Sequence, residues 1–97
     1  MRVIAKRTLV DFWVRHADAE ASLIEWYKSA RKADWTTPQD IKREYKTASF
    51  IGDNRVVFNI GGNKYRLIVW VNYDAASIYI KFIGTHAEYD KINAKEI

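Results

Sequence analysis

Residues 55–71 read RVVFNIGGNKYRLIVWV, the clearest strand–turn–strand pattern in the chain. Two runs rich in β-branched and aromatic residues flank the turn-forming sequence GGN at 61–63. This pattern is typical of a β-hairpin, because glycine readily takes up the backbone conformations that tight turns need. A third run, IYIKFI at 78–83, follows a second turn-like connection. The back half of the chain therefore predicts a three-stranded antiparallel meander.

The front half is helical by pattern, after a short strand expected within residues 1–6. Apolar residues fall on one helical face from Leu9 to Trp13, and Thr8 is the expected N-cap of that helix. A second amphipathic stripe runs through residues 17–32. No Gly or Pro separates the two stretches, so one continuous helix and a helical hairpin both remain open.

Two further helix starts are marked by capping sequences. Thr37 fits an N-cap and Pro38 fits the first helical position of a short helix over about 38–45. Near the end of the chain, Thr85 and Glu88 have the spacing of a capping box. The order of strand, helices and then three strands predicts an α+β fold, with the helices packed on one face of the sheet.

Composition limits the class of protein. The length of 97 residues, of which 48% are hydrophobic, predicts one domain over residues 1–97 with a single core. The absence of Cys excludes a disulfide scaffold and any site built on thiolates. No apolar run approaches the roughly 20 residues that span a bilayer, so we expect a cytoplasmic protein without membrane contact. The net charge of +4 is compatible with a nucleic acid or an acidic protein as partner.

Strand parity sorts the side chains of the meander onto two faces, because alternate residues point to opposite sides. One face is expected to hold the core residues Phe58, Ile60, Tyr65, Leu67, Val69, Ile78, Ile80 and Phe82. The other is expected to hold Lys64 and Arg66, with Asn59 across the hairpin, and Tyr79 with Lys81 on the last strand. A cationic face suits a phosphate backbone, although an ordinary solvated sheet face has the same pattern.

The sequence GTHAEYDK at 84–91 places His86, Tyr89 and Asp90 just beyond the last strand. In a helix, residues three and four beyond His86 lie on its side. Together with Arg66, these groups match the needs of RNA cleavage: a base for the 2′-OH, a cation for the phosphate, and an acid for the leaving oxygen. The alternative is that His86 and Tyr89 only pack the terminal helix onto the sheet.

Other features of the sequence point to no further chemistry. His16 lies in a helical stretch and is interpreted as structural or exposed. The two histidines have no acidic partners at metal-ligand spacing, so neither a metal site nor a cofactor is expected. The basic helical residues Arg31 and Lys32 are candidates for RNA contact, and a solvated helix surface is the alternative.

Two motifs together resemble a known family. NIGGNKYRL at 59–67, followed about twenty residues later by GTHAEYDK, resembles the HigB toxins within the RelE/ParE superfamily, and the resemblance covers nearly the whole chain. It implies a RelE-like fold and a ribosome-dependent mRNA endonuclease, which cuts the codon in the A site by metal-independent attack of the 2′-OH. It also implies a HigA-type antitoxin with a helix-turn-helix domain as partner.

The resemblance also implies roles for individual residues. Arg66 matches the arginine that stabilises the scissile phosphate, and His86 matches the catalytic position after the last strand. The candidate catalytic residues are His86, Arg66, Tyr89 and Asp90, and the candidate RNA-binding residues are Lys64, Asn59, Lys81, Lys91, Arg31 and Lys32. RelE-type relatives have a basic residue where this chain has His86, so the roles of acid and base do not transfer from RelE.

Two rival functions fit the same fold. A ParE-like toxin would inhibit gyrase and would need no proton-transfer residue. A noncatalytic RNA-binding module would use only the basic face, so that replacing His86 would leave RNA affinity unchanged.

Overall fold

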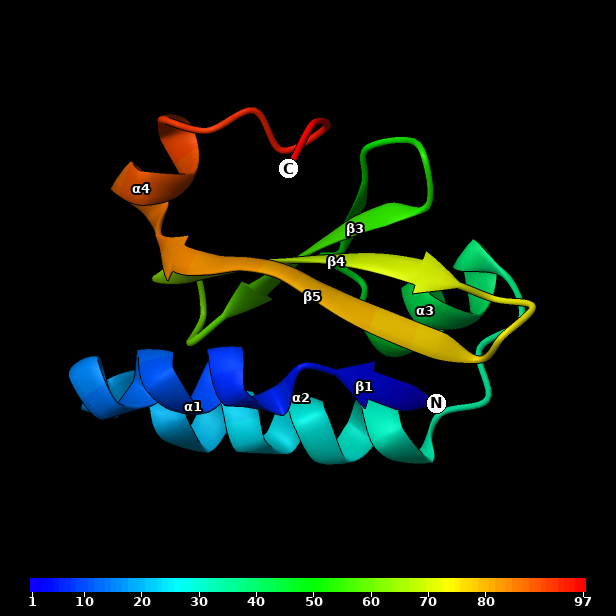
Figure 1. The fold of residues 1–97 in the computed structure, drawn as a ribbon, viewed down its shortest axis with the longest axis horizontal. Coiled ribbons are helices and arrows are strands. Elements are labelled where there is room, and N and C mark those ends of the chain that lie inside the picture. The colour runs from blue at the N-terminus through cyan, green and yellow to red at the C-terminus, as the bar shows by residue number, and fades with distance from the viewer.

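A computed structural model describes all residues 1–97 as a sheet with the longer helices on one face and a short C-terminal helix and tail on the other (Figure 1). The elements in order are β1 (Arg2–Ile4), α1 (Lys6–Arg15), a 3-10 turn (Ala17–Ala19), α2 (Glu20–Lys32), α3 (Pro38–Glu44), β2 (Ser49–Phe50), β3 (Arg55–Ile60), β4 (Tyr65–Asn72), β5 (Ser77–Thr85) and α4 (His86–Asp90). The strand order is β1-β5-β4-β3-β2, with β1 parallel to β5 and the other pairs antiparallel. The predicted α+β fold is therefore confirmed.

α1 and α2 form a helical hairpin, which decides between the two arrangements that the sequence left open. The chain breaks at His16 and turns through the 3-10 segment into α2. The apolar stripe of α2 lies inward as predicted, with Leu23, Trp26 and Ala30 buried against the sheet. The expected N-cap at Thr8 is wrong, because α1 begins two residues earlier and Thr8 lies in its first turn.

The central hairpin forms as predicted, and both glycines of its turn adopt positive φ angles. β3 and β4 pair from Arg55 opposite Trp70 to Ile60 opposite Tyr65. β2 has no strand pattern that is recognisable in the sequence, because it is only two residues long; it pairs with β3 at the sheet edge. Together these pairings place the hairpin turn and the start of α4 at the same end of the sheet, because Tyr65 also pairs with Thr85.

A β-bulge in β5 overturns one prediction. Val69 pairs with Ile80 but Ile68 pairs with Phe82, so Lys81 is an extra residue in β5. Phe82 was predicted on the core face by strict alternation, and this is wrong because the bulge shifts the alternation by one residue. A Cβ atom added at Gly84 would clash with Cζ of Phe82, so the Phe82 ring covers Gly84.

The face of the sheet opposite α1 and α2 is not the open solvated face that parity suggested. We call it the tail face, because Figure 1 shows α4 and residues 91–97 on that side. Val57 and Ile68 lie on this face and are 3% and 0% exposed. Arg55, also on this face, donates to the carbonyl of Ile97 at 3.1 and 2.8 Å. The centre of the tail face is therefore a second apolar layer, and polar side chains gather at its hairpin end.

The main core is centred on aromatic side chains. Replacing Phe58 tests how much this core contributes to the free energy of unfolding. Its ring lies 5.1 Å from that of Tyr45 and 5.4 Å from that of Trp26, and it is 1% exposed. Phe58→Ala is expected to lower the free energy of unfolding by about 3–5 kcal/mol, measured by urea denaturation, because it leaves a cavity that rigid neighbours cannot fill. Phe50→Ala is the control, since Phe50 is 40% exposed. A loss below about 1 kcal/mol for Phe58→Ala would contradict this assignment of the core.

Candidate active site

Arg66 is the centre of the polar cluster at the hairpin end of the tail face. It lies near the start of β4, directly across from Asn59 on β3. Its Nη1 donates to the side-chain oxygen of Asn59 and, at 3.2 Å, to that of Asn63 in the hairpin turn. Two amide oxygens therefore fix one edge of the guanidinium. The other edge, at Nη2, faces α4.

His86, the first residue of α4, meets this free edge. Its Nε2 lies 2.7 Å from Nη2 of Arg66. A guanidinium has only donors, so Arg66 donates and Nε2 accepts with its lone pair. The proton of the neutral ring is then on Nδ1, which lies 3.6 Å from a carboxylate oxygen of Asp90. Asp90 thus favours the tautomer in which Nε2 is a free base.

Tyr89 completes the cluster from the same side of α4. The carbon at the centre of the Arg66 guanidinium lies 5.8 Å from the centroid of the Tyr89 ring, within range of a cation–π contact. The structure thus brings together all four residues predicted as catalytic, Arg66 from the start of β4 and the other three from α4. Their arrangement offers a base, a cation and a phenol within one small area of surface.

Local sequence fixes the start of α4, and with it the direction of His86. The side chain of Glu88 accepts a hydrogen bond from the Thr85 amide at 2.8 Å, and the Thr85 hydroxyl accepts one from the Glu88 amide at 3.1 Å. The predicted capping box is therefore confirmed. Five residues make only a weak helix by themselves, so these two bonds are needed to hold α4 in place.

The capping box makes the order of α4 dependent on pH. The Thr85 amide holds the pKa of Glu88 below its ordinary value of 4.5. Because the folded pKa is the lower one, the stabilisation is complete above about pH 4.5 and is lost as the pH falls through the folded pKa. We expect the Thr85 amide signal in NMR spectra to move sharply below pH 4.5, and to show no such titration in Glu88→Gln.

Glu96→Gln is the control for this titration, because no amide donates to the Glu96 side chain. That variant should titrate at Thr85 like the wild type. An unchanged Thr85 titration in Glu88→Gln would contradict the role given to the capping box.

Lys64 does not join Arg66, contrary to the prediction that the two share a face. It lies in the hairpin turn, and its ammonium pairs with the carboxylate of Asp18 in the 3-10 turn. Tyr65, whose side chain lies on the α1–α2 side, also donates to Asp18. These hydrogen bonds, that of Lys64 foremost, hold the pKa of Asp18 below its usual range. The cluster ties the hairpin turn to the helical hairpin.

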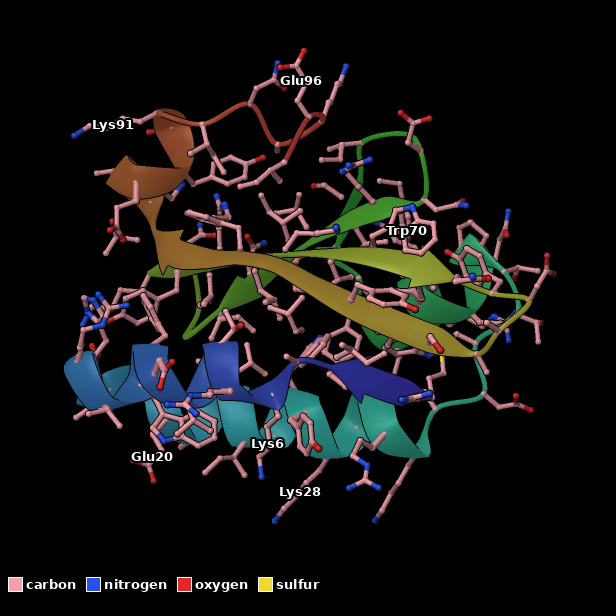
Figure 2. All side chains as sticks on the ribbon, viewed as in Figure 1. Lys6, Glu20, Lys28, Trp70, Lys91 and Glu96 are labelled. Carbon is pink, nitrogen blue, oxygen red and sulfur yellow. The ribbon has the colours of Figure 1, made fainter.

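The remaining candidates lie apart from the cluster. Lys81 is exposed at the β5 bulge and Lys91 is exposed at the end of α4, and neither forms an ion pair. Arg31 and Lys32 lie in a groove between α1 and α2. Figure 2 shows Lys28 of this groove pointing away from the sheet, with Lys91 at the other side of the molecule. Arg31 and Lys32 therefore face away from Arg66.

Two contacts are not predictable from the sequence. Asn63 accepts a hydrogen bond from Arg66, although the sequence marks it only as part of the turn. Asp18, outside the Arg66 cluster, holds the hairpin turn, although the sequence marks it only as an acid at a helix start. His16 has the structural position expected for it. Its ring stacks on Phe12 at 4.3 Å and meets Tyr65 edge-on at 5.6 Å.

The site is open, and it is built from few groups. Half of the His86 side chain and 65% of the Asp90 side chain are exposed. The chain brings no three His, Cys, Asp or Glu side chains together in a way that could hold a metal ion. None of the helices has the length and hydrophobicity of a membrane-spanning segment.

A helical hairpin on a mainly antiparallel sheet, with an Arg–His cluster at one end of the sheet, defines a small RelE-like α+β protein. Residues 19–92 match the family model described as HigB toxin, the RelE-like toxic component of a toxin-antitoxin system. The chain belongs to this family, and the matched range contains the whole Arg66–His86 cluster.

Curated relatives extend this likeness over nearly the full length. The chain is 27% identical over 94 residues to the mRNA interferase HigB of Escherichia coli O6:H1, covering 95% of this chain and 91% of that protein. It is 26% identical over 96 residues to the mRNA interferase toxin HigB of Escherichia coli K12, covering 97% and 92%. The mRNA interferase HigB of Shigella flexneri matches with the same values.

Proposed function

We propose that this toxin is an endoribonuclease that cleaves mRNA in the ribosomal A site and so stops translation. The observation that carries the proposal is the 2.7 Å contact between Nη2 of Arg66 and Nε2 of His86, with a carboxylate oxygen of Asp90 3.6 Å from the other ring nitrogen. The names of the curated relatives, which are mRNA interferases, support the same activity.

In the proposed reaction, the scissile phosphate binds the Nη2 edge of Arg66 and takes the place of His86 there. The freed Nε2 then accepts the proton of the ribose 2′-OH. The 2′-oxygen attacks phosphorus, the bond to the 5′-oxygen breaks, and a 2′,3′-cyclic phosphate forms. Arg66 stabilises the charge that develops on the phosphate oxygens. No metal ion takes part, because the guanidinium supplies the positive charge.

Tyr89 is the proposed donor of the proton that the leaving 5′-oxygen needs, because its phenol belongs to the same cluster. Tyr89→Phe is expected to slow cleavage about 10²-fold in single-turnover assays on programmed ribosomes. A substrate with sulfur in place of the bridging 5′-oxygen needs no proton on leaving, so it should restore the rate of Tyr89→Phe but not that of His86→Gln. Equal rescue of both variants, or of neither, would contradict this division of roles.

Dependence on the ribosome is proposed from the openness of the site. Because half of the His86 side chain and 65% of the Asp90 side chain are exposed, the chain alone would contact a bound RNA from one side only. A second surface is then needed to exclude water and to hold the 2′-oxygen in line with the leaving group. We propose that the decoding centre supplies this surface, which would place the toxin in the cytoplasm.

The chemistry is tested with a substrate that lacks one oxygen. An mRNA with a 2′-deoxyribose at the cleavage position should resist the toxin on programmed ribosomes, while the all-ribose mRNA should yield a 2′,3′-cyclic phosphate. Cleavage of the deoxy substrate would overturn attack by the 2′-OH.

Membership of the family also implies a protein partner, the antitoxin. The toxin is one component of a toxin-antitoxin system, so an antitoxin must bind it. We propose that this antitoxin is of the HigA type, with a helix-turn-helix DNA-binding domain.

A further inference from the structure

A groove between α1 and α2 has no part in the proposed chemistry. It has a volume of about 550 Å³ and opens on the side of the molecule away from the tail face (Figure 2). Its apolar surface comes from Trp13 of α1 and from Ile24 and Tyr27 of α2. All three side chains are only partly buried, so the helical hairpin leaves apolar surface exposed here.

Positive charge surrounds this apolar surface. The lining contains the four cations Lys6, Lys28, Arg31 and Lys32 and no carboxylate. None of the four takes part in an ion pair within the chain. The groove therefore combines an apolar floor with an unneutralised basic rim, and its complement is an acidic segment that carries apolar side chains.

The cations around Tyr27 favour a protein segment over RNA as the ligand of this groove. The Lys6 ammonium lies 4.8 Å from the centroid of the Tyr27 ring, and the Arg31 guanidinium lies 5.8 Å from it. With two cations already against the ring, it is a poor platform for a stacked base. The aliphatic Ile24 likewise suits an apolar side chain rather than a nucleotide.

We propose that this groove docks an acidic amphipathic helix of the cognate antitoxin, with apolar residues on its floor and Asp or Glu along its rim. A third helix packs naturally along the furrow between two others, with anchor residues three and four positions apart. The proposal rests on membership of the toxin–antitoxin family and not on the nuclease chemistry. It separates the surface that the antitoxin binds from the Arg66–His86 site on the other face.

The test measures binding of the purified cognate antitoxin to the full toxin chain by titration calorimetry. Lys6→Glu/Lys28→Glu should weaken binding at least tenfold, and Ile24→Ala should weaken it about fivefold. Lys46→Glu/Lys95→Glu, with the same change in net charge at exposed positions outside the groove, should bind like the wild type. Equal affinity of the wild type and both double variants would overturn the proposal, as would equal weakening by both.

A growth assay in cells distinguishes antitoxin docking in the groove from contact of the groove with RNA or the ribosome. The Lys6→Glu/Lys28→Glu toxin should arrest growth like the wild type, yet the antitoxin should no longer restore colonies. Loss of growth arrest in the folded double variant would overturn the proposal and assign the groove to RNA or ribosome contact. If the toxin proves not to cut mRNA, the calorimetric result still stands, because it does not depend on the target of the toxin.

Discussion

His86→Gln is expected to lower the rate of mRNA cleavage by about 10²–10⁴-fold, the usual range for loss of a general base. Glutamine keeps an oxygen that can accept the hydrogen bond from Arg66, so the guanidinium stays in place. It has no lone pair basic enough to take the 2′-OH proton. The rate is measured under single-turnover conditions on ribosomes that carry a defined A-site codon, so that substrate binding and product release do not limit it.

His16→Gln is the matched control for this substitution. His16 stacks on Phe12 within the helical hairpin and has no contact with Arg66, so its loss should change the rate less than about threefold. His86 is half exposed, so His86→Gln should unfold at the same urea concentration as the wild type. A fully folded His86→Gln toxin with near wild-type cleavage would show that His86 only packs α4 onto the sheet.

Arg66→Ala should have the second largest effect, a loss of about 10²–10³-fold in cleavage. The substitution removes the only guanidinium in the cluster, and with it the charge proposed to stabilise the phosphate in the transition state. Arg66→Lys should recover only part of the rate, because an ammonium cannot bond both asparagines and still present a second donor edge toward His86. The measured quantity is again the single-turnover rate at saturating ribosome complex.

The asparagines give the control for this effect. Asn63→Ala leaves the charge of Arg66 in place and removes one of its two anchors, so its effect should be much smaller than that of Arg66→Ala. Lys81→Ala, at an exposed position outside the cluster, should lower affinity for the substrate complex at most slightly. Equal losses for Arg66→Ala and Lys81→Ala would indicate a diffuse basic surface and not a defined phosphate site.

The parts of the fold that follow from local sequence were predictable. The GGN turn between two β-branched runs forms the central hairpin, and the Thr85–Glu88 spacing forms the cap of α4. Both depend on contacts within a few residues. The β5 bulge was not predictable, because it is an irregularity in the pairing of two strands and leaves no trace in an alternating pattern.

The site shows the same division between local and distant contacts. The placement of His86 beside Asp90 and Tyr89 follows from helical spacing alone. The pairing of Lys64 with Asp18 could not be predicted from local sequence, because Asp18 lies 46 residues away and reaches the hairpin only through the packing of α1 and α2. Parity alone also could not show that residues 91–97 cover the tail face.

Primer-extension mapping of mRNA ends in a reconstituted translation reaction tests directly whether the toxin cuts mRNA on the ribosome and needs His86 to do so. Wild-type toxin and His86→Gln are compared, with a parallel reaction that omits ribosomes. We expect cuts within codons that require ribosomes and disappear in His86→Gln. Intact mRNA in the presence of folded wild-type toxin and translating ribosomes would contradict the nuclease assignment, and inhibition of gyrase supercoiling would then be the activity to measure.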